Sequence, residues 1–180
     1  MDRPDEALAD ANRAVELDAG QLYTRLFVAS YVGADRTAIE DATTLLQRGE
    51  PTADLLSSRG LAYLQVGELQ QGLDDFNRAL EIDPEYAEGY DRRGYAYFLL
   101  GDYERSKQDL DEALSRIATL PPQGRAELHY HCALLLRAQG RRDAALADLG
   151  EASKLVEVPS VRRAIEELRR SLEGEGVGSK

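Results

Sequence analysis

The chain repeats itself with a period of 34 residues, and this period limits the folds that it can adopt. The segments 53–84 and 87–118 carry the same landmarks at one offset. The landmarks that stand 34 residues apart are Gly60 and Gly94, Tyr63 and Tyr97, Gly67 and Gly101, and Ala79 and Ala113. Repetition at this length is typical of proteins built from stacked supersecondary units, each of which buries its apolar face against its neighbours.

Each unit of the repeat predicts two helices. In the unit 53–86, Gly67 is placed to end the first helix, because glycine readily leaves the right-handed helical region. Phe76 and Ala79 stand on the apolar stripe of the second helix. Gly60 on the first helix and Ala79 on the second are small, so the two helix axes can approach closely.

The period continues in both directions from the two clear units. Gly33 precedes Gly67 by 34 residues, and Gly140 follows Gly101 by 39. The extra five residues fall in LPPQGR (120–125), whose two prolines and glycine predict a loop. The array is therefore expected to continue through this insertion.

The repeated motif resembles the tetratricopeptide repeat, whose pattern is W-x2-L-G-x2-Y, then A-x3-F, then P. Tyr63 and the segment FNRALEIDP (76–84) carry the resemblance, whereas Leu56 stands in the tryptophan position and Arg59 in the leucine position. The resemblance implies an all-α fold, a right-handed α-solenoid of stacked helix-turn-helix repeats. It also implies that the first helix of each repeat, helix A, lines a concave face on which peptides or helices of partners lie.

The repeats predict a single solenoid over residues 1–173. Its expected parts are a half repeat at 3–19, full repeats at 19–52, 53–86, 87–120 and 126–159, a capping helix at 160–173 and a flexible tail at 174–180. The half repeat contains only the second helix, helix B. The missing helix A would leave Leu8, Ala11 and Val15 exposed. That face supports an alternative hypothesis, in which the N-terminal helix forms a homodimer or docks the rest of a larger chain.

The segment HYHC (129–132) holds both histidines and the only cysteine of the chain. Helical residues two apart point in different directions, so His129 and His131 are not expected to share a metal ion. His129 and Cys132 can share a helix face, but two ligands make a poor zinc site. We expect both to pack in a helix of the fifth unit, with no metal site and no cofactor.

Other catalytic patterns are missing from the sequence. It has no G-x-G-x-x-G, G-x-S-x-G or H-E-x-x-H motif. Carboxylate pairs such as Asp74 and Asp75 are expected on solvent-exposed helix faces. The sequence therefore predicts a non-enzymatic interaction scaffold.

The resemblance implies a set of partner-binding residues on the helices A. The groove positions carried over to this sequence are Tyr23, Phe27, Tyr31, Asp54, Leu61, Gln65, Glu88, Asp91, Tyr95, Phe98, Tyr130, Leu134 and Arg137. Tyr23, Phe27 and Tyr31 follow one another at i, i+4 and i+8, so they form one stripe. Core packing is the alternative interpretation of these aromatic residues. Members of the family that grip a terminal carboxylate use Lys and Asn at such positions. This chain has neither residue at the groove positions.

The charge of the chain favours basic partners. Residues 1–120 carry 12 Lys and Arg against 24 Asp and Glu, within a total charge of −11. This acidity disfavours binding to nucleic acid and anionic membranes, although it also serves solubility. A single cysteine predicts a reducing compartment such as the cytoplasm, and 19 Arg against 3 Lys is typical of a GC-rich bacterial genome. We expect a protein or peptide partner with basic and apolar residues.

Overall fold

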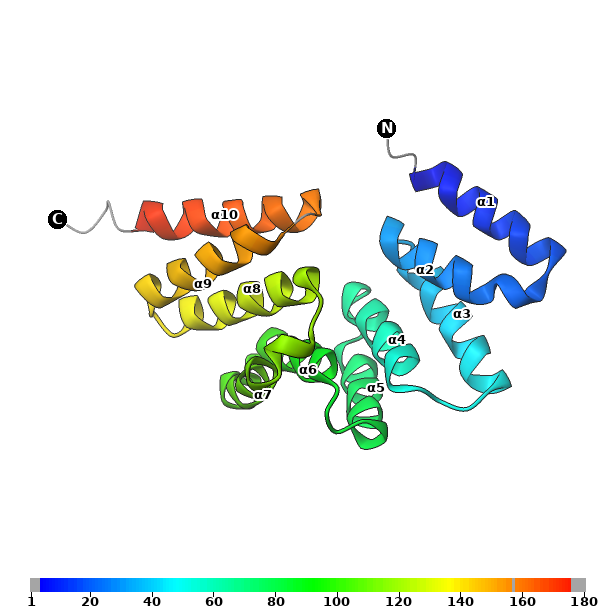
Figure 1. Ribbon diagram of the computed structural model, residues 1–180, viewed down its shortest axis with the longest axis horizontal. Coiled ribbons are helices and arrows are strands. Elements are labelled where there is room, and N and C mark those ends of the chain that lie inside the picture. Colours follow the sequence, from blue (N-terminus) through cyan, green and yellow to red (C-terminus); the bar gives the residue numbers. More distant parts are fainter. Residues whose placement is uncertain (1–3, 157, 176–180) are drawn as a thin grey trace. The chain divides into compact units, whose positions relative to one another are not determined.

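The computed structural model describes residues 4–156 and 158–175, and this part of the chain consists of helices joined by short connections (Figure 1). Over these residues the chain forms ten α-helices and two short 3-10 helices, and no strand. It divides into two compact units, Met1–Tyr86 and Ala87–Lys180. The predicted all-α fold of stacked helix pairs is confirmed, while the single domain over 1–173 stays a prediction.

The first unit contains a single helix followed by two helical hairpins. Its α-helices are α1 (Pro4–Leu17), α2 (Leu22–Val32), α3 (Asp35–Arg48), α4 (Ala53–Gln65) and α5 (Leu69–Ile82), with the 3-10 helix η1 (Ala19–Gln21) between α1 and α2. Each helix packs against the next along the chain. The helices α2 and α4 are therefore the helices A of their repeats, and α3 and α5 are the helices B.

The second unit contains two hairpins followed by a single helix. Its α-helices are α6 (Ala87–Leu99), α7 (Tyr103–Ser115), α8 (Pro122–Ala138), α9 (Arg142–Leu155) and α10 (Pro159–Glu175), with the 3-10 helix η2 (Ile117–Thr119) before α8. The last helix packs against both α9 and α8. It closes the repeat as the predicted capping helix does, but it begins at Pro159 and ends at Glu175.

Glycines make the hairpins possible at two kinds of position. The four turns between helix A and helix B each contain a glycine with positive φ, from 70° at Gly140 to 83° at Gly67, as predicted for Gly67. Gly60 serves a close helix contact instead, because a Cβ atom there would lie 2.7 Å from Cε1 of Phe76. The predicted approach of helices α4 and α5 is thus confirmed.

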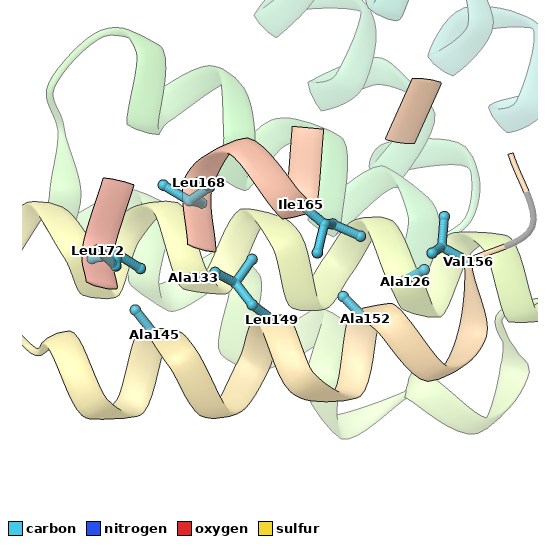
Figure 2. Packing of buried hydrophobic residues seen from close by; sticks show 9 residues of the cluster. All are labelled: Ala126, Ala133, Ala145, Leu149, Ala152, Val156, Ile165, Leu168 and Leu172. Atoms are coloured by element: carbon cyan, nitrogen blue, oxygen red, sulfur yellow. The ribbon is translucent and has the colours of Figure 1, made fainter. Parts of the chain in front are cut away.

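The core is a series of small clusters between neighbouring helices. In the first unit, Leu26, Ala29, Ala38 and Leu55 belong to one such cluster. In the second, α10 places Ile165, Leu168 and Leu172 beside residues of α8 and α9 (Figure 2). Alanines stand among the larger leucine and isoleucine side chains of these clusters, which lets the helices of each hairpin lie close together.

The start of α8 differs from the predicted loop at 120–125. Helix α8 begins at Pro122, so the residues through Arg125 form its first turn. Proline is compatible with this position, because the first helical N–H groups have no intrahelical acceptor and φ is already near the helical value. The inserted residues therefore lengthen a helix as well as a connection.

The predicted exposed face of the N-terminal helix is also wrong. Ala11 is buried, and Leu8 and Val15 are partly buried. Helix α1 packs against α2, and Leu8 contacts the cluster formed by α2, α3 and α4. The observation that motivated self-association through this helix is therefore absent.

The predicted tail at 174–180 lies partly inside and partly outside the described residues. Gly174 and Glu175, expected in a flexible tail, belong to α10, whereas residues 176–180 lie outside the described part of the chain. No helix of that part combines the length and apolar character needed to cross a lipid bilayer.

Candidate partner-binding surfaces

Helix α2 presents an exposed row of aromatic side chains. Tyr23 is 57% exposed, Phe27 74% and Tyr31 67%. The opposite face of the same helix carries Leu22 and Leu26, which are buried. Core packing therefore accounts for one face of α2 but not for the aromatic row. The three aromatic residues, spaced i, i+4 and i+8, lie together on the other face.

A cleft of about 240 Å³ lies between α2 and α4 at one end of this row. Its lining includes three of the predicted groove residues, Tyr31, Leu61 and Gln65. Ser58, from α4, and Asp35, the first residue of α3, also line it. The first unit thus brings an aromatic ring, an aliphatic side chain, an amide and a carboxylate together around one hollow.

Asp35 is the residue of this cleft that the sequence analysis missed. Burial raises the pKa of its carboxyl, and a hydrogen bond from its own backbone N–H opposes that shift. The repeat pattern gives no signal for it, because Asp35 lies just after the glycine turn and not on helix A. Asp35 lines the cleft because of the way α2, α3 and α4 pack together, which the repeat pattern does not describe.

Tyr95 on α6 and His131 on α8 form a stacked pair in the second unit. Their ring centroids are 4.2 Å apart at an interplanar angle of 12°. Nδ1 of His131 lies 2.8 Å from Oδ1 of Asp91, which is only 2% exposed. Asp91 was predicted as a partner-binding groove residue, but its carboxylate is buried against the His131 imidazole inside the chain.

The predicted groove residues of α8 lie against the capping helix. Tyr130 and Leu134 are partly buried and pack on the cluster that contains Ile165 and Leu168 of α10. Burial raises the pKa of the Tyr130 phenol. Arg137 is exposed and donates a hydrogen bond of 3.0 Å to Oγ of Ser171, also on α10. These residues therefore hold α10 in place, whatever else they contact.

The remaining groove positions are dispersed. Glu88 accepts a hydrogen bond of 3.2 Å from Arg92, one turn further along α6. Phe98 is partly buried, with its ring 6.3 Å from that of Tyr95. Asp54 is exposed in the first unit and accepts a long hydrogen bond of 3.5 Å from Oη of Tyr86. None of these three lines the cleft between α2 and α4.

A repeated ion pair joins helix A to helix B in three hairpins. The pairs are Arg25 with Asp41, Arg59 with Asp75, and Arg93 with Asp109, each 16 residues apart. In each pair Nε and Nη2 of the arginine donate to the two carboxylate oxygens, at 2.6 to 2.8 Å. Asp75, expected on a solvent-exposed face, is therefore buried.

The signal for these pairs is present in the sequence. The three arginines stand 34 residues apart, and so do the three aspartates. Hydrogen bonding to aspartate raises the pKa of Arg25, Arg59 and Arg93. Arg59 departs from the family pattern because this chain replaces an apolar contact of leucine with a two-pronged ion pair.

The segment HYHC supplies a variant of the same brace in the fourth hairpin. Cys132 occupies the arginine position, while Nδ1 of His129 lies 2.9 Å from Oδ1 of Asp148 on α9. His129 and His131 thus contact carboxylates from different helices. Cys132 is 6% exposed, and burial raises the pKa of its thiol far above the ordinary value.

Metal ligands do not gather in the helices that the structure describes. Within residues 4–156 and 158–175, no group of three or more His, Cys, Asp or Glu is arranged to hold a metal ion. The two histidines each face a single carboxylate.

Comparisons with known proteins agree with the fold and its repeats. Two family models described as tetratricopeptide repeat match residues 53–86 and 87–119. No curated protein sequence matches the chain. The solved structure of TTC0263, a thermophilic TPR protein of Thermus thermophilus, is 25% identical with a TM-score of 0.73, and the match covers 92% of this chain and 90% of that one.

Two other structures extend the comparison to proteins that bind peptides. YrrB, a TPR protein with an unusual peptide-binding site, is 18% identical with a TM-score of 0.58, over 91% of this chain and 84% of its own. The first TPR of Spaghetti (RPAP3), bound to the HSP90 peptide SRMEEVD, is 16% identical with a TM-score of 0.57, over 70% and 94%. The two matching repeats place residues 53–119 of this chain in the tetratricopeptide repeat family, and the hairpins on either side have the same glycine turns.

Proposed function

We propose that this protein is a non-enzymatic interaction scaffold that holds a peptide or helix of a partner protein on the helices A of its first unit. The exposed aromatic row of α2 carries this proposal. Phe27 is 74% exposed on a helix whose opposite face already fills the core. Exposed aromatic side chains in such a row supply binding energy when a partner covers them.

The position of the row also supports the proposal. Peptide partners of this family lie against the helices A, and α2 is a helix A. Tyr31, the last residue of the row, lines the cleft between α2 and α4 together with Leu61 of α4. The second unit offers less free apolar surface on its helices A, because Tyr95 stacks on His131 and Tyr130 packs toward α10.

The charge of the first unit supports a basic and apolar partner. Residues 1–86 carry 7 Lys and Arg against 17 Asp and Glu. Arg25 and Arg59 are already committed to buried carboxylates. The peptide SRMEEVD held by the RPAP3 repeat is acidic, and this unit would repel a peptide of that kind.

A selection from random peptides displayed on phage tests the proposal. Wild-type protein is the bait, and binding of each enriched peptide is measured by isothermal titration calorimetry. The test variant, Tyr23→Ala with Phe27→Ala, removes two exposed rings that do not line the cleft. Loss of one good aromatic anchor costs about 2 kcal/mol, so binding weakens by about thirtyfold or more.

The matched control is Leu17→Ala with Ile82→Ala, which removes two exposed apolar side chains outside the row. This control is expected to bind the selected peptides like wild type. Circular dichroism establishes that both variants keep their helices. Equal binding by wild type and the aromatic variant would contradict the proposed surface.

A further inference from the structure

The cleft between α2 and α4 contains a carboxylate that no cation of the described residues neutralises. Asp35 lines the cleft, and its side chain takes a hydrogen bond from its own backbone N–H. Within residues 4–156 and 158–175, no basic side chain pairs with it. The neighbouring Arg36 has Nη1 at 3.9 Å from Oε1 of Glu68 instead. Burial disfavours the charged form of Asp35, so the position gains from a positively charged group that arrives with a ligand.

The other walls of the cleft suit the stem of a long side chain. Leu61 and the ring of Tyr31 provide apolar surface beside Asp35. Lysine and arginine lay their methylene stems on apolar surface and keep the charged end at a polar group. The Tyr31 ring attracts a cation, and the side-chain oxygens of Ser58 and Gln65, which also line the cleft, can accept further hydrogen bonds.

The electrostatic surroundings favour the same chemistry. The unit that contains the cleft has 17 acidic and 7 basic residues, so it repels anions and draws cations from a distance. An apolar side chain would fill the cleft but would remove water from the Asp35 carboxylate, whose hydrogen bond within the chain comes from its own backbone N–H, and would bring no cation to it, which is costly. A cationic side chain with an aliphatic stem satisfies both the charge and the apolar walls.

We infer that this cleft takes one lysine or arginine side chain of the partner peptide, with the cation at Asp35 and the stem against Tyr31 and Leu61. This inference rests on the proposed function, because the same peptide covers the aromatic row of α2. It adds a position of defined chemistry to that surface, next to residues that bind by apolar contact alone. Asp35 would then set specificity, and Tyr23 and Phe27 would set affinity.

The test repeats the phage selection with two single variants as bait. Asp35→Asn keeps the size of the side chain and removes its charge. Asp74→Asn removes the same charge from an exposed position of α5, in the same unit, that neither lines the cleft nor belongs to the groove positions. Peptides enriched by wild type are sequenced, then resynthesised with the conserved basic residue replaced by glutamine. Affinities are measured by isothermal titration calorimetry.

We expect wild type and Asp74→Asn to enrich Lys or Arg at one fixed position, and Asp35→Asn to lose this enrichment. Replacement of the basic residue by glutamine weakens binding about tenfold to wild type and less than about twofold to Asp35→Asn. Enrichment that survives in Asp35→Asn, or that disappears equally in Asp74→Asn, would overturn the inference. Peptides that need Tyr23 and Phe27 but carry no fixed basic residue would overturn it while leaving the proposed function intact. Absence of any such peptide would overturn both.

Discussion

Removal of one partner of the Arg59–Asp75 pair should destabilise the first unit strongly. Asp75 is 2% exposed, and the Arg59 side chain is 14% exposed. The variant Asp75→Ala removes the acceptor of two N–H groups, each 2.7 Å from a carboxylate oxygen, and leaves only the bond of 3.1 Å to Thr43. An uncompensated charge of this kind costs about 3 kcal/mol, the lower end for a broken buried pair.

Removal of both partners should cost much less than the sum of the two single changes. Arg59→Leu leaves the Asp75 carboxylate buried, with only Nη1 of the half-exposed Arg78 3.8 Å from Oδ1, and also costs about 3 kcal/mol. In the double variant no charge is stranded, so the loss should be about 1–3 kcal/mol, and the coupling energy at least about 3 kcal/mol. Leucine is also the residue that the family pattern has at this position.

Urea unfolding followed by circular dichroism measures these differences. A loss of about 3 kcal/mol lowers the midpoint by about 1–2 M at the m values usual for domains of this size. Glu151→Gln is the control, because it breaks an exposed pair with Lys154, whose side chain is 68% exposed, and should leave the urea midpoint close to that of wild type. A double variant whose loss equals the sum of the single losses would refute the reasoning.

Four further outcomes follow from burial and close contacts. Gly150→Ala should stabilise the protein by about 1 kcal/mol through helix propensity, because a Cβ atom there meets nothing within 4 Å. Gly60→Ala should destabilise it by about 1 kcal/mol, because overpacking against the buried Phe76 ring outweighs the same gain; thermal unfolding of both variants checks the two signs. Ellman's reagent should label Cys132 only in denaturant, because burial of the thiol raises its pKa and blocks access; rapid labelling of the folded protein would contradict this. Ile165→Ala should lower the free energy of unfolding by about 2–5 kcal/mol, since Ile165 of α10 is 1% exposed in the cluster that α10 forms with α8 and α9; the urea midpoint measures this loss.

The hairpins could be predicted from the sequence because their determinants are local and periodic. Gly67 repeats at the period and takes the positive φ that a turn after helix A needs. Phe76 falls on the stripe that faces the preceding helix, where it is fully buried. Pro122 was misjudged because proline usually interrupts a helix, yet at the first turn it is compatible with one.

The polar residues of the ion pairs recur at the same period, but which of them contact one another could not be predicted in the same way. Arg59 and Asp75 are 16 residues apart on different helices, and their pairing depends on the angle between α4 and α5. Ala11 and Asp91 were expected on exposed faces. Instead, α2 packs against the helix of Ala11, and His131 contacts the Asp91 carboxylate. Asp35 reaches the cleft only because three helices converge there. Side chains that bridge elements depend on tertiary packing, which a repeat pattern leaves undefined.

The braces between helix A and helix B have a consequence for how such a chain can be altered. Each of the first three hairpins contains both halves of its ion pair, and the fourth contains both His129 and Asp148. A hairpin that contains both residues of the contact between its two helices is a transferable module, which recombination can duplicate or an engineer can transplant without redesigning that contact. The array of this chain could therefore be lengthened one hairpin at a time, because each new copy would bring its own stabilising pair.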